Sequence, residues 1–284
     1  MNQSLLKTRN ESCPFCDNKH SKRVYRTKNF ELLECLHCSL IRTHLLSKVS
    51  SPSDEIYQDR TEALRQLYTQ KEKFEDYARE IMDLVPITSG KLLDVGCGLG
   101  WVVKEANNRG FKATGIDSAL HFVTVGKEFL QVPIKTCTFE DFKAKEKFDV
   151  IVFKHVLEHI KDLNSFLKKV KSLLTARGFI IVACPNINSL MFFVFKDRWY
   201  GLQAAQHIWQ FTPKSIKKVF EQNGFISLAV VVRNLDYQVL GWKKILFKIL
   251  IHLGNSFRKG DQLFVIARNP SQKEYGTVKL AEKV

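Results

Sequence analysis

Apolar positions recur along the chain with two periods, one typical of amphipathic helices and one typical of buried strands. Apolar side chains at helical spacing, among them Phe74 and Ile81, predict two consecutive helices over about 60–70 and 71–85. Pro86 ends the second of them, because proline cannot continue a helix.

Short apolar runs bounded by glycine or polar residues predict the strands of a sheet. The run 91–95 leads directly into a glycine-rich turn, and the helical pattern after the turn ends at Gly110. Thr212 and Pro213 provide an N-cap and a first-turn proline for a helix over 213–223. Because strands and helices alternate, the pattern predicts an α/β fold. Further strands are predicted at 111–117, 148–153, 178–184, 225–232 and 261–268.

The composition is that of a globular protein, with 45% hydrophobic and 26% charged residues among 284. It excludes a disordered, collagen-like or mucin-like chain, and the length predicts one large domain with a smaller appendage. The 44 Lys and Arg outnumber the 29 Asp and Glu, which gives a net charge of +15. This charge favours an anionic partner without choosing among nucleic acid, phosphorylated carriers and acidic lipid.

The first residues lack the apolar core of a secretory signal, and no uncharged apolar run of about 18 residues could span a bilayer. We therefore expect a cytoplasmic protein with reduced thiols. Four of the seven cysteines form two Cys-x-x-Cys pairs, Cys13 with Cys16 and Cys35 with Cys38. This spacing predicts a zinc ribbon whose four thiolates hold a structural Zn²⁺; buried thiols or a redox pair are the alternatives. His20 and His37 lie nearby and are expected at the surface.

Residues 94–100 read DVGCGLG and join the first predicted strand to a helix. Glycines there let the backbone approach a ligand, and the helix N-terminus offers free N–H groups to it. Asp117 ends the next predicted strand, where its carboxylate can accept hydrogen bonds from a ribose. A dehydrogenase that binds nicotinamide is the nearest alternative, but its fingerprint has a third glycine where Trp101 stands here.

Residues 91–233 resemble the core of the class I S-adenosylmethionine-dependent methyltransferases. Residues 94–100 resemble the first motif of that family, 115–117 its ribose acid and 139–141 its adenine loop, although Thr138 stands where an acid is common. The resemblance implies a Rossmann-like sheet of seven strands, parallel except the last, with an antiparallel edge strand. It also implies that S-adenosylmethionine is held by Asp94, Gly96, Cys97, Gly98, Gly100, Asp117, Ser118, Phe139, Glu140 and Lys154.

The segment His155-Val-Leu-Glu158-His159 follows the strand 148–153. Its spacing matches an inverted zinc-protease motif, which its place after a strand disfavours. His159 could instead be a general base for an acceptor hydroxyl. The segment also resembles a Glu-x-x-Glu-His metal cluster of ubiquinone-type O-methyltransferases, with all three side chains on one helical face. His155 replaces the first Glu, which disfavours magnesium, and a purely structural turn is the remaining alternative.

Residues 186–212 resemble the acceptor lid of methyltransferases from surface-glycan and lipid-linked sugar pathways. Their aromatic side chains could stack on a sugar or quinol ring, or could simply pack the lid onto the core. His207 is a second candidate base. The aromatic residues are Trp199, Tyr200, Trp209 and Phe211.

A helix with a wide apolar arc is predicted over 236–257, where Lys244, Lys248 and His252 recur every four residues. Such a helix can lie at a lipid interface, cover a sheet edge or bind a second copy in a homodimer. A lipid contact would place the protein at the inner face of the membrane.

The sequence thus predicts a methyltransferase that acts on a small molecule or glycan, with O-methylation of a sugar or lipid-linked intermediate of polysaccharide synthesis favoured. A nucleic-acid methyltransferase would explain the charge, but an RNA-binding motif and an Asn-Pro-Pro-Tyr-like signature are missing. A non-catalytic zinc-ribbon binding protein is the other alternative. The expected parts are a zinc ribbon at 1–48, a helical region at 49–88, a methyltransferase domain at 89–270 and a mobile tail at 271–284.

Overall fold

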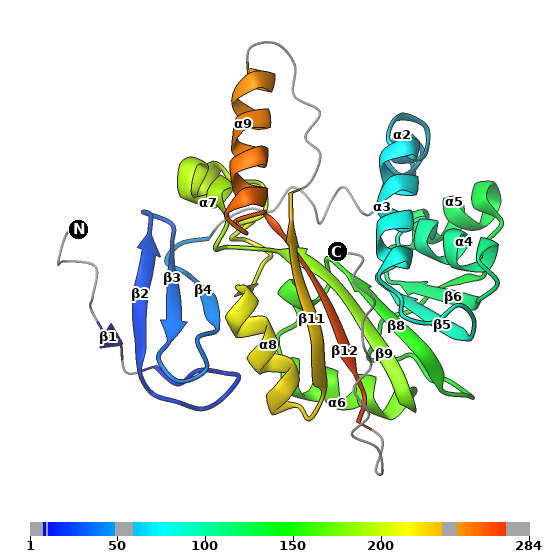
Figure 1. Cartoon of the computed structure of the whole chain (residues 1–284), viewed down its shortest axis with the longest axis horizontal. Helices are drawn as coiled ribbons and strands as arrows, with labels where there is room; N and C mark the ends of the chain where they lie inside the picture. Colours follow the sequence, from blue (N-terminus) through cyan, green and yellow to red (C-terminus); the bar gives the residue numbers. More distant parts are fainter. Residues whose placement is uncertain (1–7, 10, 49–58, 235–242, 271–284) are drawn as a thin grey trace.

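The computed structural model describes residues 8–9, 11–48, 59–234 and 243–270, which form a large and a small sheet (Figure 1). In this part of the chain the large sheet has seven strands in the order β11-β12-β9-β8-β5-β6-β7. The strands are β5 (Lys91–Val95), β6 (Lys112–Asp117), β7 (Ile134–Thr136), β8 (Phe148–Lys154), β9 (Leu174–Pro185), β11 (Ile226–Arg233) and β12 (Gln262–Arg268).

The last strand of the chain is antiparallel to both of its neighbours, as expected, but it does not form the edge of the sheet. β12 lies between β9 and β11 and pairs antiparallel with each, while β7, β6, β5, β8 and β9 are parallel. The predicted antiparallel edge strand is therefore wrong in position. β12 pairs with β9 on one side and with β11 on the other, so β11 is left at the edge of the sheet.

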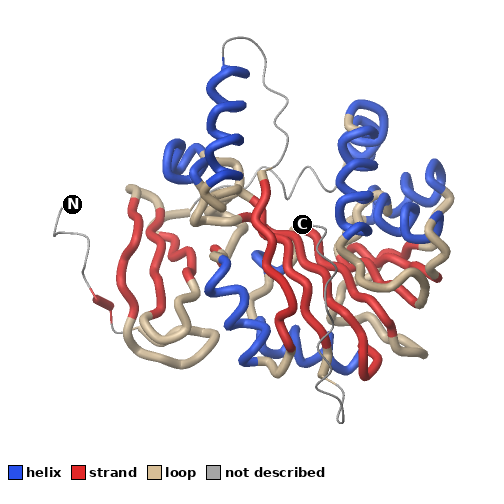
Figure 2. Tube along the Cα trace, in the orientation of Figure 1, coloured by secondary structure: helices blue, strands red, loops and turns tan. Residues whose placement is uncertain are grey.

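Helices cover both faces of the large sheet, in agreement with its alternating buried side chains (Figure 2). On β8, Ile151 and Phe153 face one layer, whereas Val150 and Val152 face the other. The first layer contains α6 (Leu163–Leu173) and α8 (Pro213–Gln222). The second contains α2 (Arg60–Thr69), α3 (Lys71–Asp83), α4 (Trp101–Asn108) and α5 (Leu120–Val125), the last continued by a π-helical turn over Gly126–Leu130.

Local signals explain several of these boundaries. Thr212 accepts a hydrogen bond from the N–H of Ser215 and forms a capping box, with Pro213 in the first turn of α8, which confirms the helix predicted there. Asp59 caps α2 by accepting from the N–H of Thr61.

The small sheet is the ribbon predicted from the cysteines, extended by a strand from far along the chain. β10 pairs antiparallel with β4, so that Trp209 lies opposite Arg42 and Gln210 opposite Ile41. The lid segment (186–212) is thus joined to the ribbon through its backbone. The strands are β1 (Thr8–Arg9), β2 (Ser21–Arg26), β3 (Phe30–Cys35), β4 (Ile41–Leu45) and β10 (Trp209–Gln210).

A third apolar cluster joins the ribbon, the lid segment and the helices α7 (Leu190–Phe195) and α9 (Lys243–Ser256). It includes Leu32 of the ribbon, Trp199 of the lid and Leu250 of α9. Among the described residues, no helix is both long and apolar enough to cross a bilayer. The predicted tail at 271–284 and the first residues of the helix predicted at 236–257 lie outside the described residues.

Candidate active site

A cavity of about 1040 Å³ opens where β5, β6 and β8 end. This is the edge at which ligands bind in parallel α/β sheets, because the strands there diverge into loops. The cavity is wide enough for a nucleotide-sized ligand and a second molecule. Its walls come from the glycine-rich turn, from α2, α3 and α5, and from the lid segment.

The glycine-rich turn after β5 forms the floor of the cavity. The N–H groups of Gly96 and Cys97 donate to the carbonyl of Ile116 at 2.9 and 3.1 Å, which ties the turn to β6. Gly98 has a φ of +53°, and a Cβ placed on it would meet no atom within 4 Å. The backbone at Gly98 therefore faces open space that a ligand can fill.

Asp117 is fixed at the end of β6 by two backbone groups. One carboxylate oxygen accepts from the N–H of Gly98 at 2.7 Å and the other from the N–H of Ala119 at 2.8 Å. Burial raises the pKa of Asp117, and these two hydrogen bonds oppose that shift. Each oxygen keeps a lone pair that can accept from a ribose hydroxyl.

Asp94 is buried, and its Oδ1 has no hydrogen-bond partner. Burial raises the pKa of its carboxyl to about 7, and the positive charge of Lys154 only partly opposes the shift. Burial also lowers the pKa of Lys154 to about 8. The ammonium of Lys154 lies 4.9 Å from the ring centre of Phe74 and 4.5 Å from that of Tyr77. An unpaired buried acceptor beside an open cavity fits a cationic group of a ligand, such as the ammonium of S-adenosylmethionine.

Most of the cofactor contacts that the resemblance implies line this cavity, and three do not. Gly100 caps α4 with a φ of +90°, and a Cβ there would lie 2.8 Å from Val132, so it serves close packing. Phe139 is buried against Phe153 and Phe166, whereas Glu140 is exposed, and neither residue lines the cavity. The lining includes Asp94, Gly96, Cys97, Gly98, Asp117, Ser118 and Lys154.

The segment 155–159 forms a short turn rather than a helix. His155 has a φ of +54°, and only Leu157–His159 adopt a 3₁₀ turn, so the expectation of three side chains on one helical face is wrong. The Nδ1 of His155 lies 3.1 Å from Oε1 of Glu158, while Oε2 of Glu158 is buried without a hydrogen-bond partner. Burial raises the pKa of Glu158, but the interactions with His155, His207 and His159 outweigh burial, so the pKa is lowered overall.

His207 of the lid takes the place in this cluster that His155 was expected to have. Ligand atoms of Glu158, His159 and His207 lie within 4.8 Å of one another, and the two imidazole rings are 4.8 Å apart. The Nδ1 of His207 lies 2.9 Å from the carbonyl of Gly201, so Nδ1 carries the proton and Nε2 is an acceptor. Burial lowers the pKa of His207 to about 4, which keeps it neutral at pH 7.

The aromatic side chains of the lid are mostly part of the core. Trp199, Trp209 and Phe211 are buried, and the indole N–H of Trp209 donates to the carbonyl of Ile160 at 2.7 Å. Of the four aromatic residues of the lid, only Tyr200 lines the cavity. The expectation that Trp199, Trp209 and Phe211 stack on a ring of the acceptor is therefore wrong. The packing alternative holds for these three because each fills an apolar cluster.

The helices α2 and α3 contribute a wall of the cavity that the sequence does not predict. Gln66 of α2 and Lys73, Phe74 and Tyr77 of α3 line the cavity. The helical pattern of this region was visible, but it does not show which face meets a cavity. Gln203 and Gln206 add polar groups from the lid.

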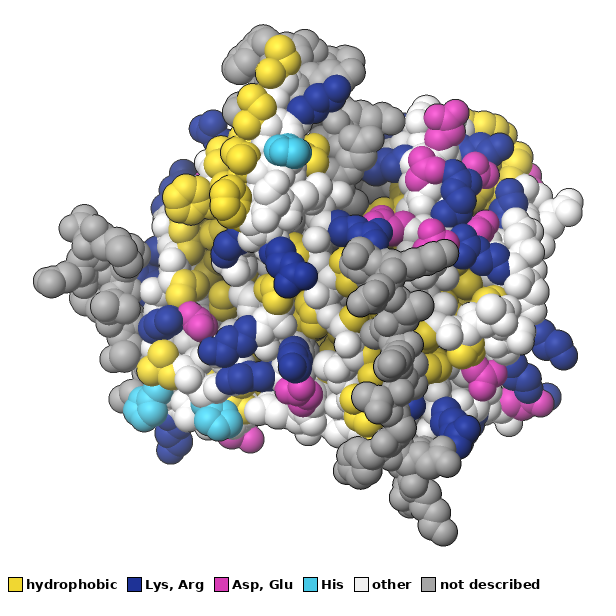
Figure 3. Space-filling view, in the orientation of Figure 1, with side chains coloured by type: hydrophobic (Ala, Val, Ile, Leu, Met, Phe, Trp, Pro, Cys, Tyr) yellow, Lys and Arg dark blue, Asp and Glu magenta, His cyan; other side chains and the backbone are white. Residues whose placement is uncertain are grey.

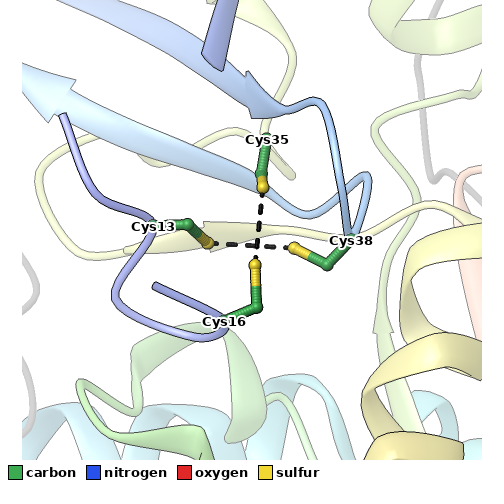
Figure 4. Close-up of side chains that lie close together, drawn as sticks. All are labelled: Cys13, Cys16, Cys35 and Cys38. Atoms are coloured by element: carbon green, nitrogen blue, oxygen red, sulfur yellow. Dashed lines mark hydrogen bonds between the residues drawn. The ribbon is translucent and has the colours of Figure 1, made fainter. Parts of the chain in front are cut away.

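The four ribbon cysteines converge on one point, Cys13 and Cys16 from a loop and Cys35 and Cys38 from the end of β3 and the turn after it (Figure 4). The sulfurs of Cys13 and Cys38 are 3.8 Å apart, and those of Cys16 and Cys35 are 3.6 Å apart. Four thiolates bound tetrahedrally at about 2.3 Å from Zn²⁺ have sulfurs about 3.8 Å apart, so the cluster fits a zinc ion. His20 and His37 are exposed and lie outside the cluster.

The ribbon also holds the part of the lid that carries His207. The side-chain hydroxyl of Thr43 in β4 donates to the carbonyl of His207 at 2.7 Å, and its N–H donates to the carbonyl of Ile208 at 2.9 Å. The side chain of Gln210 donates to the carbonyl of Leu202 at 2.9 Å. The position of the catalytic candidate His207 therefore depends on the folded ribbon.

Comparison with known proteins agrees with this site. Residues 69–230 match the family described as "Methyltransferase domain". The chain belongs to this methyltransferase family. The match covers the five parallel strands β5 to β9, the glycine-rich turn and the lid, and it ends within β11, before β12.

Curated relatives and solved structures agree with the family. A ubiquinone biosynthesis O-methyltransferase of Nitrobacter winogradskyi is 28% identical over 54% of this chain and 61% of its own length. That of Pelagibacter ubique is 31% identical over 45% of this chain and 53% of its own length, so the chain spans only about half to three fifths of these relatives.

Two solved structures share the fold at low identity. An S-adenosylmethionine-dependent methyltransferase of Thermotoga maritima has a TM-score of 0.55 at 14% identity and covers 76% of this chain and 98% of its own. The 1,6-didemethyltoxoflavin-N1-methyltransferase of Burkholderia thailandensis, bound to 1,6-didemethyltoxoflavin and S-adenosylhomocysteine, has a TM-score of 0.50 at 12% identity. It covers 88% of this chain and 99% of its own.

Proposed function

We propose that this protein transfers the methyl group of S-adenosylmethionine to a hydroxyl group of a small acceptor molecule. The observation that carries the proposal is the cavity floor, where the backbone at Gly98 faces open space and where Asp117 and Asp94, with its unpaired Oδ1, line the same cavity. The family match and the names of the curated relatives support the same reaction.

Three groups on the floor would bind separate parts of the cofactor. Asp117 would accept from the ribose hydroxyls, the turn around Gly98 would contact the methionine part, and Asp94 would accept from its ammonium. When bound, the cofactor supplies a sulfonium methyl that is already activated for transfer. The protein then has to align the acceptor with that methyl and exclude water.

The lid side of the cavity supplies a base for an acceptor hydroxyl. His159 is exposed to the cavity and would take the proton from the hydroxyl as the acceptor oxygen attacks the methyl. The buried carboxylate of Glu158 would stabilise the imidazolium that forms, and the neutral His207 offers a second acceptor. A carboxylate oxygen of Glu158 with the two imidazoles also fits a divalent cation of the zinc type rather than magnesium.

The acceptor that we propose is an amphipathic molecule with a ring hydroxyl, for which the relatives named for ubiquinone biosynthesis are the main support. Burial of three lid aromatic residues weakens the expectation of a sugar stacked on the lid. A sugar or lipid-linked intermediate of polysaccharide synthesis stays a prediction without support from the relatives. We also propose that the four clustered cysteines hold a structural Zn²⁺.

Calorimetric titration with S-adenosylmethionine and S-adenosylhomocysteine tests the proposal. We expect micromolar binding that Asp117→Ala weakens by about tenfold or more, because charge-assisted hydrogen bonds to the ribose are lost. Asp76→Ala is the matched control, since that carboxylate lies on the exposed face of α3. A folded, zinc-loaded protein that binds neither ligand would contradict the proposal and leave a non-catalytic zinc-ribbon protein. Tight binding to RNA that falls steeply with salt would favour a nucleic-acid substrate.

A further inference from the structure

The helices α7 and α9 expose large apolar side chains on one continuous surface (Figure 3). Phe193 of α7 is 69% exposed, and Ile245 and Ile249 of α9 are 67% and 51% exposed. Leu253 and Phe257 continue the row at intervals of four residues. We call these five residues the apolar ridge. Exposed apolar side chains gathered in this way mark a surface that binds a partner.

The apolar ridge is not needed to fasten α9 to the protein. The opposite face of α9 does that, with Leu250 buried in the third apolar cluster and Phe247 stacked on Phe195 of α7 at 5.2 Å. A helix that is apolar on its inner and outer faces has more apolar surface than its own packing uses. The outer face is therefore free to enter another apolar medium.

Basic side chains border the apolar ridge. The ammonium of Lys196 lies 4.6 Å from the ring centre of Phe193. Lys248 precedes Ile249 on α9 and Arg198 follows α7 in the sequence, and both side chains are exposed. Within the described residues, Arg198, Lys248 and Arg258 make no ion pair. Within the segments 190–200 and 245–259, Asp197 is the only acidic residue. The charged side chains of the two segments that carry the ridge are thus almost all positive.

We propose that the apolar ridge and its basic border dock on an anionic lipid bilayer. Apolar side chains that can enter the interface, together with unpaired cations that meet anionic headgroups, are what an interfacial helix needs. A second copy of the chain fits the surface less well, because a two-fold contact would bring the same cations together.

The docked orientation has a consequence for the cavity, which rests on the proposed function. α7 is followed by a 3₁₀ turn over Lys196–Arg198 and then by Trp199 and Tyr200, and Tyr200 lines the cavity. A bilayer at the ridge would therefore meet the lid side of the cavity. An amphipathic acceptor could then reach the cavity from the bilayer without crossing water.

Sedimentation with vesicles tests the proposal on the full-length, zinc-loaded protein. We expect binding to phosphatidylcholine vesicles that contain about 30% phosphatidylglycerol, and at least about tenfold weaker binding to pure phosphatidylcholine. Ile249→Asp should reduce binding to the anionic vesicles by about tenfold or more. Tyr68→Asp is the matched control, because it adds the same charge at an exposed large side chain on α2, outside the cavity lining and away from the ridge.

A charge reversal separates the basic border from the net charge of the protein. Lys248→Glu should weaken vesicle binding several-fold, whereas Lys127→Glu, at an exposed position outside the ridge, should leave it nearly unchanged. Calorimetry with S-adenosylmethionine on the same variants reports the proposed function separately. Vesicle binding that the ridge variants leave unchanged would overturn the proposal. So would a dimer in ultracentrifugation that Ile249→Asp dissociates, because a second copy would then occupy the ridge.

Discussion

At the scale of single residues, the proposed contact of Asp94 with the cofactor should make cofactor binding depend on pH. Its carboxyl has a pKa raised to about 7 because it is buried and Oδ1 lacks a partner. An ammonium placed beside it would favour the charged form and lower that pKa. Below pH 7 the carboxyl of Asp94 is therefore mostly protonated in the free protein, whereas it would be ionised to a larger extent in the complex with the cofactor.

We predict that binding of S-adenosylmethionine at pH 6.5 releases a substantial fraction of a proton. The release should decline above pH 8, where the carboxyl of the free protein is already ionised. Calorimetry in buffers of different ionisation enthalpy measures the released protons directly. Asp94→Asn should abolish this release, and release that persists in the variant would assign the proton to another group, such as Lys154.

Single residues also show how far the sequence alone could predict the site. The clustered cysteines, the glycines of the turn and Asp117 can be predicted because each belongs to a short sequence motif. The partnership of His159 with His207 joins residues on separate loops, so only the folded chain reveals it. Phe139 was placed beside the cofactor by resemblance, yet its ring packs into the core between α6 and the sheet.

At the scale of elements, β4 of the ribbon is part of the machinery that positions the lid. Thr43 holds the carbonyls of His207 and Ile208 and pairs the ribbon with β10 next to them. The ribbon is therefore a support for one wall of the cavity, and its strand fixes the backbone around a candidate base.

We predict that Thr43→Val lowers the rate of methyl transfer by about three- to tenfold and leaves the affinity for S-adenosylmethionine unchanged. The substitution keeps the shape of the side chain but removes the hydroxyl donor, at a cost of about 1 kcal/mol in unfolding free energy. Thr124→Val removes a similar side-chain hydrogen bond on the exposed face of α5 and serves as the control. Steady-state kinetics with calorimetry gives both quantities, and equal effects of the two substitutions would contradict a positioning role.

Most helices and strands of the large sheet followed from periodicity, because each buries one face or both. The segment 155–159 did not, since the left-handed backbone of His155 breaks the helical pattern that its spacing indicated. β10 could not be predicted, because two residues carry no period and the strand exists only by pairing with β4.

At the scale of the whole molecule, the proposed zinc ion should couple the stability of the ribbon to activity. We predict one structural zinc per chain and a Cys35→Ser variant that loses it. Metal analysis, thermal unfolding and calorimetry should show a lower melting temperature and little methyl transfer, with binding of S-adenosylmethionine largely kept. This follows because the cofactor residues lie on the large sheet, whereas His207 depends on the ribbon.

Cys137→Ser is the control, since that thiol lies outside the cluster. Full activity in a zinc-free, folded protein would contradict the coupling. The sequence does not predict that the ribbon joins the rest of the protein through β10, because its paired cysteines are typical of a small independent domain. Only the contacts between distant segments show that it is not one.

The pairing of β4 with β10 also bears on the order of events during translation. Contacts between the ribbon and the rest of the protein join residues 149, 164 and 181 positions apart, at Phe15 with Asn164, Thr43 with His207 and His37 with Lys218. A nascent ribbon could close around its metal early, but β4 would stay an open edge until its partner strand leaves the ribosome. During that interval β4 of the nascent chain would be an unpaired edge strand, with which strands of other chains can pair.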